Sequence, residues 1–222
     1  MLYLYNKNAG LSQLFLEGDD HRYIFKVRRH KIEEILYLRN LQNEVVYKYR
    51  ITSMDKKSLL LVLEEEKILP ITAKKKLHIG WCVIDPKSIE KVLPSLNEIG
   101  VDKITFIYCS RSQKSFKLDF NRFHKILLNS SQQSGRSSLM ILEKEECLKT
   151  FLTNNPQTKM LNFSRDNFIS TSEVSTIVIG CEGGFTEEEI SLFNPKDIIG
   201  FDTPLVLKSE SAICSVASKL LL

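Results

Sequence analysis

The second part of the chain alternates short apolar runs with longer segments in which apolar side chains recur every three or four residues. The short runs are rich in β-branched residues, which is typical of strands buried on both faces of a parallel sheet. They occupy residues 77–84, 103–108 and 176–179. Because the longer segments have the periodicity of amphipathic helices, the pattern predicts an α/β domain.

The first part follows another pattern, in which strand-like runs are separated by polar turns. These runs occupy residues 23–25, 34–38, 44–49 and 58–63. Their regular spacing predicts a small all-β barrel or sandwich over residues 1–72. The linker is expected within residues 64–76, which hold three consecutive acids, Pro70 and three consecutive lysines. The α/β domain is expected to occupy residues 73–222.

Proline, glycine and capping residues mark where helices begin and end. Asp85 and Pro86 provide an N-cap followed by proline at the first helical position, and Gly100 is expected to end that helix. Pro94 lies inside the same helix and predicts a kink or an early break. Further helices are expected over residues 119–135 and 209–222, and short strands over 139–142 and 160–163.

Composition narrows the class of protein. Hydrophobic residues make up 43% and charged residues 26%, as in ordinary globular proteins. No apolar run is long enough to cross a membrane and the start lacks a secretory pattern, so a cytoplasmic location is expected. The five cysteines lack metal-ligand spacing and argue against both a metal site and a disulfide framework. Cys82, Cys109 and Cys214 are expected to be buried small hydrophobes.

Positive charge is concentrated near the start. Residues 1–76 hold 15 Lys/Arg against 10 Asp/Glu, whereas residues 77–222 hold 16 against 17. Within the first part, residues 21–31 place seven basic or potentially basic side chains among aromatic and aliphatic ones. This mixture suits phosphate contact and base stacking, and it is equally typical of a solvated face whose apolar side lies in the core.

The most distinctive stretch, STIVIGCEGGF, covers residues 175–185. A β-branched strand enters a loop with three glycines in five residues, and Thr186 with Glu189 forms a capping-box pattern that begins a helix. Strand, loop and helix is the arrangement at which α/β sheets bind ligands; a tight turn without a ligand is the alternative. Because the motifs of nucleotide-binding loops, serine hydrolases and zinc proteases are missing, the chemistry is assigned to this loop and to residues 207–212.

Several segments, spread over nearly the whole chain, together resemble one family. Residues 179–185, IGCEGGF, are similar to its IGPEGG loop, and residues 206–212, VLKSESA, to its ILRTETA loop. Residues 133–136, QSGR, and the turn at 98–101 followed by Arg111 match two further segments, and the basic stretch from His21 fits as well. The chain thus resembles the SPOUT methyltransferases, and within them the family that methylates N3 of a uridine in 16S ribosomal RNA of the small subunit.

The resemblance implies a fold and a set of ligands. It implies a PUA-like, RNA-binding β-barrel followed by a SPOUT α/β domain with a C-terminal trefoil knot, a homodimer, and S-adenosyl-L-methionine as cofactor. The implied cofactor contacts are Ile179, Gly180, Cys181, Glu182, Gly183, Gly184, Leu205, Val206, Leu207, Ser209 and Ala212. The implied catalytic residues are Lys208, Glu182, Arg136 and Arg111, and the RNA contacts Arg22, Lys26, Arg28, Arg29, Arg111 and Arg136.

Two departures from the family pattern affect the expected mechanism. Cys181 replaces a proline, and Lys208 replaces an arginine. At position 208 a compact ammonium charge therefore stands where the family has a planar guanidinium that donates two parallel hydrogen bonds. Either Lys208 supplies the charge that stabilises a uracil anion, or Arg111 or Arg136 does. Glu182 and Glu210 are candidates for a base or a ligand-orienting group, with helix capping as the alternative for Glu210. The other functions considered are a SPOUT enzyme acting on transfer RNA and a non-catalytic rRNA-binding protein.

Overall fold

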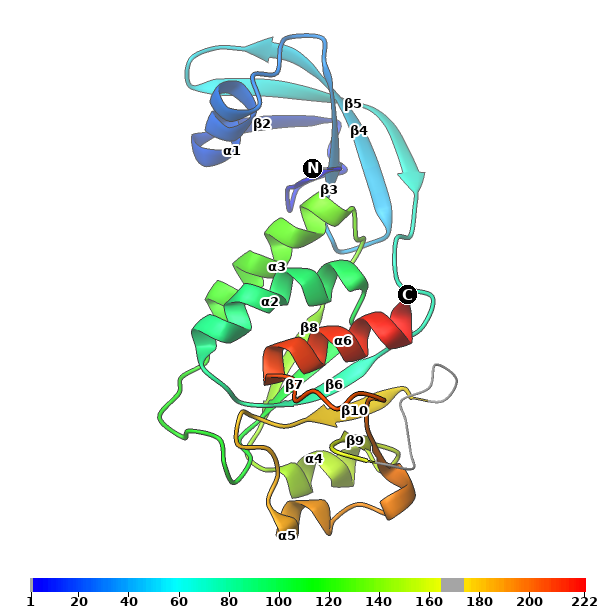
Figure 1. Ribbon diagram of the computed structural model, residues 1–222. Coiled ribbons are helices and arrows are strands. Elements are labelled where there is room, and N and C mark those ends of the chain that lie inside the picture. Colours follow the sequence, from blue (N-terminus) through cyan, green and yellow to red (C-terminus); the bar gives the residue numbers. More distant parts are fainter. Residues whose placement is uncertain (1, 165–173) are drawn as a thin grey trace. The chain divides into compact units, whose positions relative to one another are not determined.

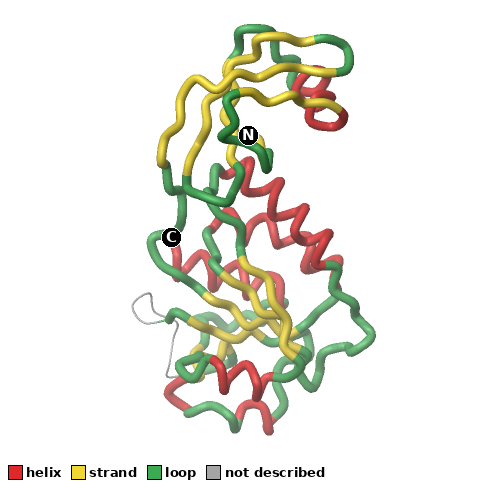
Figure 2. Tube along the Cα trace, turned by 180° about the vertical axis from the view of Figure 1, so that it is seen from behind, coloured by secondary structure: helices red, strands yellow, loops and turns green. Residues whose placement is uncertain are grey.

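The computed structural model describes residues 2–164 and 174–222. The chain divides into two compact units, one of residues 1–72 with 131–138, the other of residues 73–130 with 139–222. Figure 2 shows the strands gathered in two separate sheets. The segment 131–138 contains the QSGR motif, and it groups with the first unit although its neighbours in sequence belong to the second.

The first unit is built on a curled five-stranded sheet. In the order β1-β3-β4-β5-β2 it contains β1 (Leu4–Tyr5), β3 (Ile35–Arg39), β4 (Val45–Met54), β5 (Ser58–Ile68) and β2 (Gln13–Glu17). β1 pairs with β3 in parallel, and the other pairs are antiparallel. In the described residues β1 and β2 remain edge strands, so backbone pairing does not close the expected barrel. Alternate residues such as Leu14, Leu36 and Leu61 form the core.

The strand expected at residues 23–25 is wrong. The chain leaves β2 at Gly18, whose φ of +63° favours glycine, and forms α1 (Gly18–Arg22) and the π-helix η1 (Tyr23–Val27). Asp19 and Asp20 occupy the first turn of α1, where negative charge stabilises a helix. Ile24 is fully buried, so one apolar residue of this segment, rather than a strand face, anchors it to the core.

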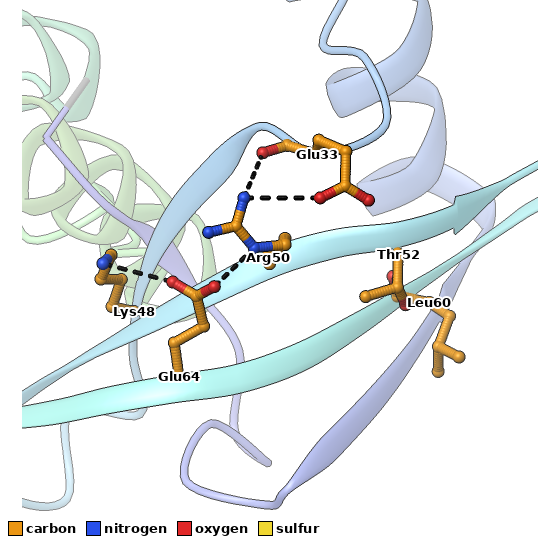
Figure 3. Close-up of polar contacts among 6 residues, drawn as sticks. All are labelled: Glu33, Lys48, Arg50, Thr52, Leu60 and Glu64. Carbon is orange, nitrogen blue, oxygen red and sulfur yellow. Dashed lines mark hydrogen bonds and ion pairs between the residues drawn. The ribbon is translucent and has the colours of Figure 1, made fainter.

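The expected linker is also wrong at its start, because β5 continues to Ile68. Its acidic residues lie on the strand, where Glu64 contacts two basic side chains of β4 (Figure 3). Glu64 pairs with Arg50 at 2.5 Å and with Lys48 at 3.2 Å, and Arg50 also contacts Glu33 at 3.5 Å. Opposite charges across neighbouring strands stabilise the sheet, so a charged run that reads as a linker is compatible with a strand.

The second unit contains a six-stranded sheet in which every pair is parallel, as the apolar runs predict. In the order β11-β9-β10-β6-β7-β8 it contains β11 (Ile198–Ile199), β9 (Lys159–Leu161), β10 (Thr176–Ile179), β6 (His78–Cys82), β7 (Lys103–Ile107) and β8 (Ile141–Glu145). Its helices are α2 (Pro86–Ile99), α3 (Phe120–Ser134), α4 (Leu148–Asn154), α5 (Glu187–Ile190), η2 (Pro195–Asp197) and α6 (Ser209–Leu221), although the last residues of α3, from Ser131, group with the first unit. α2, α3 and α6 cover one face of the sheet, and α4 and α5 the other (Figure 1).

Side chains of β6 alternate between these two helical layers. Trp81 packs near Phe106 of β7, with the ring centroids 6.1 Å apart. A Cβ on Gly80 would lie 2.8 Å from the ring of Phe151 in α4, so this helix approaches the strand more closely than any side chain would permit. β6 is therefore packed on both faces, as its apolar sequence predicts.

Two expectations for this unit are corrected. α2 continues through Pro94 to Ile99, so the early break is wrong; Gly100, at φ +108°, ends the helix as expected. Cys82 and Cys109, expected as free buried residues, form a disulfide with their Cα atoms 5.6 Å apart. Cys82 ends β6, and Cys109 lies two residues after the neighbouring parallel strand β7, a proximity that a separation of 27 residues does not reveal.

Candidate active site

The glycine loop follows β10, an inner strand between β6 and β9. Ile179 at the end of the strand is buried. Gly184 has a φ of +67°, and its amide donates to the Cys181 carbonyl at 2.9 Å. A Cβ on Gly180 would lie 3.3 Å from the Cα of Gly184. The loop therefore folds tightly back on itself, which explains why glycines recur there.

Ser209 joins the two loops that the sequence singles out. It is the first residue of α6 and is 5% exposed. Its hydroxyl donates to the Gly180 carbonyl at 2.5 Å and accepts from the Trp81 indole Nε1 at 2.8 Å. Ser209 therefore connects the start of α6 both to the glycine loop and to β6.

Arg111 is the predicted cation that contacts the glycine loop. Its Nη1 donates to the Gly183 carbonyl at 2.6 Å. A Cβ on Gly183 would lie 3.3 Å from the Cδ of Arg111, so the stem of the side chain runs against the loop as well. Arg111 itself is exposed, which leaves its guanidinium accessible from solvent.

Glu189 links the same region to the segment that follows β7. The predicted capping box is complete: the Glu189 amide donates to Thr186 Oγ1, and the Thr186 amide donates to Glu189 Oε2 at 3.0 Å. Glu189 Oε1 accepts from the Ser110 amide at 2.8 Å. Sequence reasoning finds the cap and misses the second contact, because Ser110 is 79 residues away.

The residues before α6 are open to solvent. Leu205, Val206 and Leu207 are 71%, 75% and 37% exposed. Lys208, the N-cap residue of α6, is exposed and has no ion pair in the part of the chain that the structure describes. Glu210 Oε2 is buried without a hydrogen-bond partner among the described residues. Apolar side chains and a buried carboxylate oxygen close in sequence suit a ligand that has both a ring and a positive charge.

The other predicted cofactor residues differ in accessibility. Ile179, Cys181, Ser209 and Ala212 are buried, whereas Glu182 and Gly183 are exposed. The buried members hold the loops in place, and the exposed members face solvent. The structure thus brings Gly180, Gly183, Ser209 and Arg111 together by direct contacts.

Arg136 groups with the first unit rather than with the glycine loop. It is 7% exposed, and its backbone carbonyl accepts from the Tyr3 hydroxyl at 2.8 Å. Burial raises the pKa of Tyr3 to about 12, although the positive charges of Arg39 and Arg136 act in the opposite direction. Tyr3 therefore stays neutral and able to donate at neutral pH.

Four of the predicted RNA contacts lie close together in the first unit: Arg22 on α1, Lys26 on η1, and Arg28 and Arg29 directly after η1. Arg22 is 3.6 Å from Asp19, and the Arg28 Nε donates to the Tyr23 hydroxyl at 2.8 Å. Lys26 and Arg29 are exposed and have no ion pair with any described residue. Their charge is not neutralised locally, in contrast to the basic side chains beside Glu64 in Figure 3.

No group of three or more His, Cys, Asp or Glu among the described residues has a geometry that would hold a metal ion. None of the described helices is both long and apolar enough to span a membrane.

Comparison with known proteins decides the family. The family described as "RNA methyltransferase domain" matches residues 72–221, and "RNA methyltransferase PUA domain" matches residues 16–64. A Helicobacter pylori protein named ribosomal RNA small subunit methyltransferase E is 37% identical over 222 residues, covering 98% of both chains. The chain belongs to the family of ribosomal RNA small subunit methyltransferase E proteins. The resemblance drawn from the loops is confirmed.

More distant members agree with this assignment. A Rickettsia conorii methyltransferase E is 25% identical, covering 100% of this chain and 95% of its own. The crystal structure of a Neisseria gonorrhoeae methyltransferase E bound to S-adenosyl methionine superimposes with a TM-score of 0.80 at 16% identity, covering 98% and 95% of the two chains. At that identity the match shows a shared fold.

Proposed function

We propose that this protein uses S-adenosylmethionine to methylate N3 of a uridine in 16S ribosomal RNA of the small subunit. The observation that carries the proposal is the junction at Ser209, which joins the glycine loop to the start of α6. Arg111 contacts the same loop at Gly183, so a cation stands where two ligand-binding loops meet. Full-length similarity to methyltransferase E proteins supports the RNA substrate.

The residues present fit the cofactor. Leu205, Val206 and Leu207 offer exposed apolar surface to an adenine ring, and in the glycine loop a Cβ on Gly184 would meet nothing within 4 Å, so the backbone there can be approached closely. Glu210 Oε2, buried without a described partner, offers negative charge to a cationic group. When bound, S-adenosylmethionine supplies an electrophilic methyl group on its sulfonium.

The protein's task in this reaction is alignment and electrostatics. N3 of uracil carries a proton that must leave, and N3 of a paired uracil is occupied, so the base must be unpaired or flipped out. Lys208 and Arg111 are exposed cations that stabilise the uracil anion, and Glu182 is an exposed carboxylate that accepts the proton. Holding N3 in line with the methyl group removes part of the entropic barrier.

The finer features implied by the family belong to the same proposal. Exposed Leu205–Leu207 and the 89% exposed Leu222 at the end of α6 favour a homodimer that covers them. Lys26 and Arg29 favour RNA binding by the PUA-like unit. The trefoil knot and the cytoplasmic location complete the proposal.

The test is methylation of unmodified small subunits and of their deproteinised RNA, with the digested nucleosides identified by mass spectrometry. N3-methyluridine from either substrate supports the proposal, and its absence from the free RNA identifies the assembled particle as the substrate. No methylated nucleoside from either, with no binding of S-adenosylmethionine by calorimetry, favours the non-catalytic RNA-binding alternative. Methylation of transfer RNA in a parallel reaction would assign another substrate.

A further inference from the structure

The first unit contains a cavity that methyl transfer does not use. Its volume is about 300 Å³, within the range of pockets that bind small ligands. Three tyrosines, Tyr3, Tyr23 and Tyr37, line it together with the basic residues Arg28 and His30, and aliphatic side chains complete the wall. Such a lining suits a flat ring that carries negative charge nearby.

The two basic side chains are held in place before any ligand arrives. Arg28 donates from Nε to the Tyr23 hydroxyl at 2.8 Å, and its Cζ lies 5.5 Å from the centre of the Tyr23 ring. His30 Nδ1 lies 2.6 Å from Glu34 Oε2, a bond that lowers the pKa of Glu34. An ionised carboxylate only accepts, so His30 donates through Nδ1 and its Nε2 stays available to a ligand.

The backbone around these side chains adopts uncommon conformations. Arg29, between the two basic residues, has a φ of +57°, and Glu33 has a φ of +73°. The preceding segment is a π-helix, Tyr23–Val27. π-helical turns and left-handed non-glycine residues cost free energy and recur at ligand-binding segments. The conformation agrees with a segment shaped to present Arg28 and His30.

The surface beside the cavity is suited to binding a polyanion. Lys26, Arg29 and Lys31 are exposed and form no ion pair with a described residue, whereas Glu34 is engaged by His30. Tyr37 is 47% exposed at the cavity and offers its ring to solvent. We propose that this cavity binds one unpaired nucleobase of the ribosomal RNA, which stacks on Tyr37 while its phosphate contacts Arg28. This inference rests on the proposed RNA-binding function and adds a second bound base, distinct from the methylated one.

The first test uses the full-length protein and unmodified 16S RNA under ultraviolet irradiation, followed by mass spectrometry of the cross-linked peptides. A nucleotide adduct on Tyr23 or Tyr37 is expected. Adducts confined to other residues, obtained with protein that methylates the same RNA, would contradict nucleobase binding in the cavity while leaving the proposed function intact. Wild-type protein that neither binds nor methylates RNA would overturn both.

Binding measurements then separate stacking from charge. Tyr37→Ala should weaken RNA binding about tenfold, because stacking on an aromatic side chain is lost, without changing the salt dependence. Tyr37→Phe retains the ring and should regain most of the affinity. Phe15→Ala is the matched control, since Phe15 is a 63% exposed aromatic of the same sheet that does not line the cavity. Equal affinity of Tyr37→Ala and Phe15→Ala would contradict the proposal, whereas unchanged circular dichroism spectra and melting curves in both exclude unfolding as the cause.

Discussion

The glycine-loop region of the second unit and the basic segment of the first unit, residues 21–31, both carry cations, yet they hold them differently. Arg111 is hydrogen-bonded to Gly183 in a loop that Ser209 also ties to α6. In the basic segment, Lys26 and Arg29 are exposed and unpaired among the described residues. The glycine loop thus fixes its arginine by a hydrogen bond, whereas the basic segment leaves Lys26 and Arg29 without a fixed partner among the described residues.

The two arrangements suit two different functions, methyl transfer and binding of the RNA backbone. Methyl transfer depends on geometry at the scale of an ångström, so its groups benefit from fixed partners. Binding the backbone of RNA depends on charge density and counterion release, for which exposed side chains suffice. Substitutions in the first region should therefore alter turnover, and those in the second should alter the salt dependence of binding.

The largest effect is expected at Lys208, the exposed N-cap residue of α6. Lys208→Ala or Lys208→Met should abolish turnover, because the positive charge that stabilises the uracil anion is removed. Lys208→Arg should retain activity, since the family pattern has an arginine at this position. Single-turnover methylation measures the effect, and normal turnover in Lys208→Ala would refute this role.

Arg111→Ala should lower kcat by about 10²-fold, the effect of losing one preorganised donor. The variant also loses the 2.6 Å bond to Gly183, so cofactor affinity should fall with it. Arg122→Ala is the matched control, because Arg122 is an exposed arginine of α3 that pairs with Glu90. Equal kcat in the two variants would show that Arg111 does not act in the reaction.

Ser209→Ala tests the junction itself. It should destabilise the protein by about 1–3 kcal/mol, because the buried Trp81 indole N–H and the Gly180 carbonyl lose their partner. The melting temperature should fall by about 5 °C and cofactor affinity should fall as well. Ser211→Ala, at an exposed position of the same helix, should change neither quantity. A stable Ser209→Ala protein would show that the loops are held by other contacts.

The double variant Lys26→Ala/Arg29→Ala tests these two exposed charges. If each contacts one phosphate, the slope of log K against log salt should decrease by about 1.4 for single-stranded RNA. Lys48→Ala should change the slope less, because Lys48 is already paired with Glu64 at 3.2 Å. Turnover at saturating RNA should stay unchanged in the double variant. A reduced kcat with an unaltered slope would reverse the assignment of the two regions.

The sequence predicts the features that depend on neighbouring residues, and it misses the contacts that join residues far apart in the chain. The apolar runs predict the parallel sheet, and local signals such as Gly100 and the Thr186–Glu189 capping box predict helix ends, because both are encoded within a few residues. The segment at Tyr23 is misread as a strand because its short apolar run, residues 23–25, fits a π-helix equally well once Gly18 has turned the chain. The Ser110–Glu189 contact and the Cys82–Cys109 pair join distant residues, and no local pattern encodes them.

The smallest expected effect concerns His78, which lies at the start of β6 and is not part of either region. Burial, and then the charge of Lys103, lowers the pKa of His78 from 6.5 to about 4. The unfolded chain therefore binds a proton that the folded chain refuses between these values, so stability is full above pH 6.5 and falls as the pH drops toward 4. The melting temperature should decrease between pH 7 and pH 5 by a few degrees less in His78→Gln than in the wild type. His124→Gln, an exposed histidine of α3, is the control and should behave like the wild type. An identical pH dependence in all three proteins would show that His78 does not couple protonation to folding.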